Sequence, residues 1–157
     1  MVTGTLPVTN GGTGVAAIQS ISAYDSGGTT CAAAAFTKIN LATENFDASG
    51  VFSSNRFTPT IAGKYIVEWS VGISSANLVG TNRYIAILYK NGAAERFGDE
   101  AVALAGNFYT SNGSSIISMN GTTDYLEVYF YNSNAATTLA TYNSNLTTFL
   151  DAIWVGL

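Results

Sequence analysis

The chain has 157 residues, of which 47% are hydrophobic and only 10% are charged, and its formal net charge is −4. A chain of this length makes one domain with a substantial core, without a metal or a disulfide. The six Lys and Arg residues are scattered, which argues against nucleic acid as a partner. No apolar run approaches the ~18 residues of a membrane helix, so we expect the sparse charge to reflect assembly with other copies of the chain.

The amino-terminal segment is glycine-rich and irregular, and it has neither the basic head nor the apolar stretch of a secretory signal. Residues 6–14 read Leu-Pro-Val-Thr-Asn-Gly-Gly-Thr-Gly. This string closely resembles an element of bacteriophage tail-fibre and related virion fibre proteins that usually joins one module to the next. The resemblance implies that residues 1–17 attach a domain of residues 18–157 to a virion, with contacts from Leu6, Pro7, Val8 and Asn10. A phosphate-binding glycine loop is the competing interpretation, but no Gly-Lys-Ser/Thr follows.

The first predicted strand covers residues 18–24, where residue types alternate, and residues 25–28 form a turn after it. Residues 32–35 are four alanines flanked by threonines, and they lead into an alternating stretch at residues 36–41. A strand is therefore favoured over a helix there. Cys31 is the only cysteine, so no intrachain disulfide forms, and we expect a small buried hydrophobe.

Residues 57–73 contain the clearest strand signal. From Tyr65 to Ile73 every second residue is apolar, with Trp69 in the middle, and this period of two is typical of a half-buried strand. Pro59 and Gly63 interrupt regular pairing before it. The pattern predicts a central core strand.

Residues 83–90 predict a second strand, and the Asn91-Gly92 pair after it is a strong hairpin signal because both residues tolerate positive φ in a type I′ turn. Both faces of this strand are apolar. We therefore expect one face to lie in the core and the other to meet a second subunit.

The remaining chain alternates short strands with turns. Residues 97–112 are predicted to be mostly loop, followed by strands at residues 115–119, 125–131 and 148–157, with a polar loop at residues 132–145. Many short strands with turn residues at regular spacing predict an all-β sandwich.

Several motifs, in order, resemble the globular head of complement component 1q and its tumour-necrosis-factor-like relatives. The stretch from Phe57 through Pro59 and Gly63 to Tyr65 is similar to the family's Phe-x-x-Pro-x-x-Gly-x-Tyr pattern; further matches fall at residues 46–52, 88–92, 124 and 148–149. The chain departs from the family at Val67, Thr123 and Asp151, where an aromatic residue and two glycines are usual. The resemblance implies a ten-stranded antiparallel jelly-roll sandwich that assembles as a trimer.

Two groups of surface residues follow from this interpretation. For trimer packing we select apolar and tyrosine positions on the two-faced strands: Tyr84, Leu88, Tyr125, Tyr129, Tyr131 and Trp154. For host receptor binding we select loop positions whose rings, amides and charges suit sugars: Arg83, Asp99, Asn107, Tyr109 and Tyr142.

The residue types give little support for catalysis. The chain has no histidine, which removes the usual general base and the commonest metal ligand, and a single cysteine without histidine is not a thiol catalyst. We expect no enzyme activity and no cofactor. Calcium is a second option for Asp99, Glu100 or Asp124, because some members of the resembled family bind it near the trimer axis, although no loop is dense in ligands.

The leading hypothesis is a non-enzymatic structural protein on the outside of a phage particle, a fibre-tip module that binds a host surface glycan or protein. Alternatives are a capsid or fibre decoration protein without receptor binding, and a virion-associated polysaccharide-degrading enzyme. A secreted complement-head protein is disfavoured by the absent signal and the fibre-type element.

Overall fold

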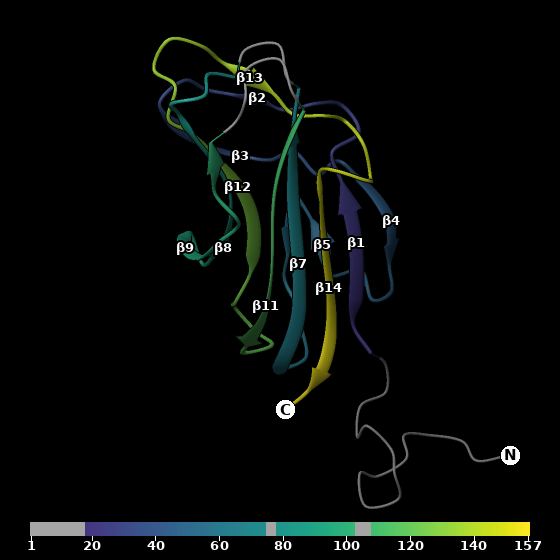
Figure 1. Ribbon diagram of the computed structural model, residues 1–157. Helices are drawn as coiled ribbons and strands as arrows, with labels where there is room; N and C mark the ends of the chain where they lie inside the picture. The colour runs from purple at the N-terminus through teal and green to yellow at the C-terminus, as the bar shows by residue number, and fades with distance from the viewer. Residues whose placement is uncertain (1–17, 75–77, 103–107) are drawn as a thin grey trace, which may run out of the picture.

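The computed structural model describes residues 18–74, 78–102 and 108–157, and these form an all-β sandwich of antiparallel sheets without a helix (Figure 1). None of the described residues belongs to a helix that is long and apolar enough to cross a membrane. The strands, in chain order, are β1 (Ser20–Tyr24), β2 (Thr30–Cys31), β3 (Ala35–Lys38), β4 (Thr43–Asp47), β5 (Phe52–Ser53), β6 (Arg56–Phe57), β7 (Gly63–Ile73), β8 (Arg83–Lys90), β9 (Ala93–Phe97), β10 (Ala101–Val102), β11 (Tyr109–Met119), β12 (Leu126–Asn132), β13 (Leu139–Ala140) and β14 (Phe149–Gly156).

The strand predicted within residues 57–73 is β7, an interior strand of one sheet that pairs with β11 on one side and β14 on the other. This sheet has the order β11-β7-β14-β1-β4, and we call it the β7 sheet. Tyr65, Val67, Trp69 and the later odd positions of β7 are at most 1% exposed. The even positions point to the outer face, as the period of two requires.

The second sheet has the order β10-β8-β12-β6-β5, with β3 paired to β12 and β9 paired to β8, and we call it the β8 sheet. The β8–β9 hairpin confirms the Asn91-Gly92 prediction, because these residues have φ of 54° and 80°. One face of β8 contributes Tyr84, Ala86 and Leu88 to the core between the sheets.

A buried carboxylate organises one end of the sandwich. At this end, Asp25 is 0% exposed, and its carboxylate accepts hydrogen bonds from the Gly28 N–H at 2.7 Å, the Thr29 hydroxyl at 2.7 Å and the Thr141 hydroxyl at 2.6 Å. This carboxylate fastens the turn after β1 to the β2–β13 pair. β1 begins at the opposite end (Figure 1). We call the end that carries β2 and β13 the loop end.

Two local predictions were wrong. Residues 32–34 interrupt the expected strand, and Ala34 has a φ of 50°, so β2 and β3 are separated by a turn. The predicted loop at residues 97–112 contains the last residue of β9, all of β10 and the start of β11. β11 extends over eleven residues, and Gly113 lets it pass closely over Trp69. The antiparallel jelly roll expected from the resemblance is observed, and the described residues form fourteen strands, several of them only two residues long.

Candidate functional site

The outer face of the β7 sheet carries a row of exposed isoleucines. Ile116 of β11, Ile66 of β7 and Ile153 of β14 are in register on neighbouring strands. Their side chains are 60%, 40% and 44% exposed, although isoleucine is among the most frequently buried residues. We call these three residues the isoleucine row. A contiguous apolar strip of this kind marks an interaction surface more often than single exposed residues do.

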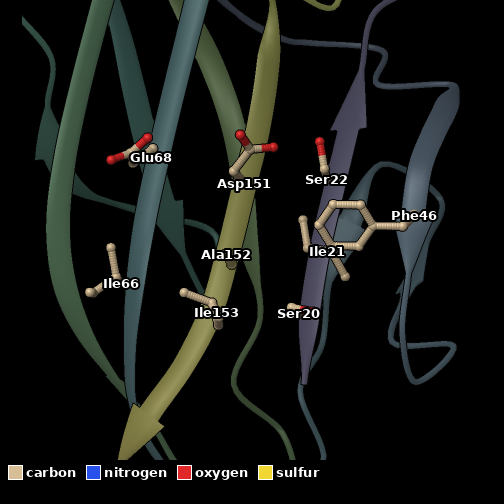
Figure 2. Close-up of a pocket in the computed structure, with 9 residues that line it drawn as sticks. All are labelled: Ser20, Ile21, Ser22, Phe46, Ile66, Glu68, Asp151, Ala152 and Ile153. Atoms are coloured by element: carbon tan, nitrogen blue, oxygen red, sulfur yellow. The ribbon is translucent and has the colours of Figure 1, made fainter. Parts of the chain in front are cut away.

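The next row along the same strands contains two carboxylates. Glu68 of β7 is directly opposite Asp151 of β14, and Ser22 of β1 and Phe46 of β4 continue the row. Figure 2 shows the two carboxylates side by side above Ile66 and Ile153. The groove around them has a volume of about 380 Å³. Polar and apolar groups therefore alternate in rows across one continuous face.

The Glu68–Asp151 pair lacks a compensating cation. Directly opposite residues in an antiparallel pair have Cβ atoms about 4.5–5.5 Å apart, where like charges are unfavourable. The ion pairs in the described part of the chain include neither residue. Asp151 Oδ1 is buried without a hydrogen-bond partner. Burial raises the pKa of Asp151, partly offset by the Ser22 hydroxyl, so this carboxyl retains a proton more readily than an exposed aspartate.

The outer face of the β8 sheet is covered by the subunit's own rings, which we call the aromatic layer: Phe36, Tyr89, Tyr125, Tyr129 and Tyr131. Tyr89 stacks on Tyr129 with 4.0 Å between ring centroids, and Phe36 stacks on Tyr131 at 4.5 Å. Neighbouring positions of β8, Ile85 and Ile87, are 2% and 0% exposed and pair with Tyr131 and Tyr129. The burial of Ile85 and Ile87 therefore needs no second subunit, contrary to the reasoning from the sequence, because the aromatic layer already covers them.

The aromatic layer is fixed by a buried charge. Glu127 is 3% exposed, and its Oε1 accepts hydrogen bonds from Lys38 Nζ at 2.7 Å and from Arg56 Nη2 at 2.8 Å. The guanidinium carbon of Arg56 also lies 3.7 Å from the centre of the Tyr125 ring. Burial acts to raise the pKa of Glu127, but the hydrogen bonds from Lys38 and Arg56 outweigh it and hold the pKa below its usual value.

A second exposed aromatic group lies at the loop end. The rings of Phe108 and Tyr142 meet edge to face with centroids 5.3 Å apart, and they are 50% and 49% exposed. The backbone holds Tyr142 firmly, because its N–H donates to Gly72 O at 2.7 Å and the Thr148 hydroxyl donates to its carbonyl at 2.8 Å. This pair presents two rings to solvent on a fixed scaffold.

The structure separates the residues selected for receptor binding. Arg83 is exposed and forms a two-point ion pair with Glu100, whose Oε2 lies 2.8 Å from Arg83 Nη2. The Asp99 carboxylate accepts a hydrogen bond from the Asn112 backbone N–H. Tyr142 belongs to the loop-end pair. Asn107 lies outside the described residues.

Tyr109 requires a correction. It is only 9% exposed, and its hydroxyl donates to Tyr84 O at 2.8 Å between the two sheets. The first residue of β11 therefore packs inward, and its ring does not reach a receptor surface. Phe108, the preceding residue, is the exposed aromatic at this position.

The trimer-packing selection also changes. Tyr84 and Leu88 are 0% exposed and Trp154 is 6% exposed, so all three are core residues of the single subunit. The other selected positions, Tyr125, Tyr129 and Tyr131, are half-buried in the aromatic layer. The attachment residues Leu6, Pro7, Val8 and Asn10 lie outside the described residues.

The carboxylates considered for calcium have other partners. Asp124 accepts hydrogen bonds from Asn91 Nδ2 at 2.8 Å and from the Asn120 backbone N–H at 3.0 Å, and it pairs with Lys90 at 2.9 Å. Glu100 pairs with Arg83. In the described ranges no group of three or more His, Cys, Asp or Glu side chains could hold a metal ion. A calcium site at these residues remains a sequence-based expectation.

Comparisons with known proteins show the fold class. No family model matches the sequence, and no curated protein sequence matches it. The structure is similar to murine APRIL, with a TM-score of 0.65 and 11% identity over 88% of this chain and 100% of that one. It is similar to the globular domain of zebrafish complement 1qA, with a TM-score of 0.52 and 11% identity over 86% and 92% of the two chains.

A third similar structure is the PRD1 vertex protein P5, with a TM-score of 0.60 and 15% identity over 88% of this chain and 96% of that one. The chain therefore has the jelly-roll fold of tumour-necrosis-factor-like and complement-1q globular domains. This confirms the all-β antiparallel fold predicted from the sequence.

Proposed function

We propose that the chain is a non-enzymatic, trimeric structural module of a phage virion, which contacts the host cell surface through its loop end. The observation that carries this proposal is the isoleucine row, an exposed apolar strip on one open face of a jelly-roll subunit. The complement-head resemblance of the sequence implies three copies. The fold similarity to a phage vertex protein and the fibre-type element at residues 6–14 support a place on a virion.

Assembly would bury the isoleucine row. In the proposed trimer the β7 sheets of three subunits face a common axis, with Ile66, Ile116 and Ile153 near its centre. Stable obligate interfaces bury roughly 2,000 Å² or more and are more apolar than the rest of the surface. The low proportion of charged residues, 10%, fits a chain that hides part of its outside in this way.

The loop end would face the host. β1 begins at the opposite end of the sandwich, which is where the chain arrives from the amino-terminal segment (Figure 1). A module anchored through that segment would present Phe108 and Tyr142 away from the virion. Aromatic rings with a polar tip suit sugar recognition, because the ring face packs on the sugar and the hydroxyl forms hydrogen bonds.

The host-contact proposal is tested by binding of the labelled protein to an array of bacterial capsule and lipopolysaccharide glycans. We expect specific glycans to be bound, and the double variant Phe108→Ala/Tyr142→Ala to lose most of that signal. Phe97→Ala is the matched control, because Phe97 is 63% exposed but lies on β9 of the other sheet.

Equal binding by both variants would contradict a role for the loop end. Each bound glycan is also assayed for new reducing ends. Release that the variant Glu68→Gln abolishes would refute the non-enzymatic proposal, since two close carboxylates are what a glycosidase needs.

A further inference from the structure

The Glu68–Asp151 pair lies at the centre of the face that the proposed trimer would bury. It is flanked by Ser114 on β11 and by Ser22 on β1 in the same row, and the isoleucine row runs directly beside it. In the free subunit Glu68 is exposed to water on this face, whereas Asp151 already has one buried oxygen without a partner. Covering the face would remove the remaining water from both groups.

Few other charges face the pair. On β4, Glu44 lies two residues before Phe46 and adds a further negative charge at the sheet edge. On β7, the cation of this face is Lys64, which lies two residues before Ile66. Its ammonium donates a hydrogen bond to Leu157 O at 2.9 Å. The β1 and β11 residues in this part of the face, Ser20, Ser22, Asn112 and Ser114, are uncharged. The described surroundings thus leave the pair negative.

An ionised pair is costly to enclose. Removing two like charges from water costs free energy through both lost hydration and mutual repulsion. One proton removes the repulsion and leaves a single charge to desolvate, and the protonated carboxyl donates a short hydrogen bond to the remaining carboxylate. Carboxyl pairs in close contact share a proton for this reason.

Because the proposed function places other copies of the chain on this face, we propose that assembly takes up protons. At least one carboxyl of the Glu68–Asp151 pair in each subunit enters the assembled state protonated, so the association tightens as the pH falls. Burial of Asp151 in the free subunit prepares it for this role, since its pKa is already raised.

Sedimentation equilibrium tests the inference on the full chain at constant ionic strength, between about pH 5 and about pH 8. Uptake of one proton per subunit would raise the trimer association constant by up to about a thousand-fold per pH unit, by linkage. We expect the isosteric variant Asp151→Asn to assemble at the high-pH end as tightly as wild type does at the low-pH end, with little pH dependence. The matched control Glu95→Gln removes a carboxylate from β9 on the other sheet. Its trimer association constant should change with pH as that of wild type does.

A trimer whose association is independent of pH, or weaker at low pH, would overturn the inference while leaving the proposed assembly intact. A folded monomer at every pH would overturn the proposed assembly and this inference with it. If Asp151→Asn does not fold, as judged by its circular dichroism, Glu68→Gln takes its place. Glu68→Gln removes the other charge of the pair, so it should reduce the pH dependence of the trimer association constant. An unchanged pH dependence would count against the inference.

Discussion

Glu127 offers a test of how the aromatic layer is held. Its Oε1 accepts three hydrogen bonds from two cations: one from Lys38 Nζ at 2.7 Å, and two from Arg56 Nε and Nη2 at 3.0 and 2.8 Å. The variant Glu127→Gln keeps the shape but removes the charge. Hydrogen bonds to charged groups are worth about 1.5–3 kcal/mol each. The side chains of Lys38 and Arg56 are 30% and 41% exposed, so water can partly replace the lost partner.

We therefore expect a loss of about 2 kcal/mol in the free energy of unfolding near neutral pH, and a fall in Tm of about 4–8 °C. The pKa of Glu127 is lowered in the folded state, so its contribution is fully present above the pKa of the unfolded chain and is lost as the pH falls through the folded pKa. The deficit of Glu127→Gln should therefore shrink towards about pH 3.

The assay is thermal unfolding by circular dichroism across this pH range, with Glu100→Gln as the matched control. Glu100 also pairs with an arginine, but its side chain is 41% exposed, so its loss should leave Tm essentially unchanged. A Glu127→Gln variant as stable as Glu100→Gln at neutral pH, or a deficit that persists undiminished in acid, would refute this reasoning.

Two further outcomes follow from the core. Gly113→Ala should lower the free energy of unfolding in urea by about 1–3 kcal/mol, because the added Cβ would lie 2.8 Å from Trp69 Cε2. The control Gly27→Ala should be nearly neutral, because nothing lies within 4 Å of its added Cβ. Equal stability of the two variants would contradict the packing of Gly113 against Trp69. Burial, with a smaller contribution from Asp25, raises the pKa of Cys31 to about 12, so a maleimide reagent should label it only after denaturation; rapid labelling of the native protein would show that the thiol is accessible.

The sequence was informative where a local pattern determines the structure. The period of two from Tyr65 to Ile73 identified β7 and its buried face, and Asn91-Gly92 identified the β8–β9 hairpin. Both signals depend on short-range geometry that few alternatives satisfy. The turn that leads into β12 formed although Thr123 replaces the usual glycine, because Asn120 Oδ1 accepts hydrogen bonds from the N–H groups of the next residues and Gly121 adopts a φ of 69°.

Most of the candidate site could not be predicted from the sequence, for a physical reason. Ile66, Ile116 and Ile153 lie on three strands that are far apart in the chain, and only the register of the sheet brings them into one row. In β7 the signal was present, since Ile66 is an apolar residue at a position where the alternation expects a polar one. Tyr84 and Leu88 were assigned to an interface because periodicity does not distinguish a face covered by the same subunit from one covered by a neighbour.

Asp151 shows how a departure from a resembled pattern can carry information. The resembled family usually has glycine at this position, and the sequence gives no direct reason for a carboxylate there. The structure places it opposite Glu68 and buries one of its oxygens. Burying an oxygen of Asp151 without a hydrogen-bond partner costs free energy in the single subunit. The proposed assembly through this face gives the carboxylate a function that would explain that cost.

The most direct test of the proposed assembly is the solution mass of three proteins by light scattering in slightly acidic buffer, at low and high salt. They are wild type, Ile116→Glu on the isoleucine row and Phe97→Glu on the other sheet; Ile116 and Phe97 are 60% and 63% exposed, so neither change should unfold the subunit. We expect wild type and Phe97→Glu to give three times 16.4 kDa in both salts, and Ile116→Glu to give 16.4 kDa. A folded wild-type monomer, or a trimer that Ile116→Glu leaves intact, would contradict assembly through the β7 sheet.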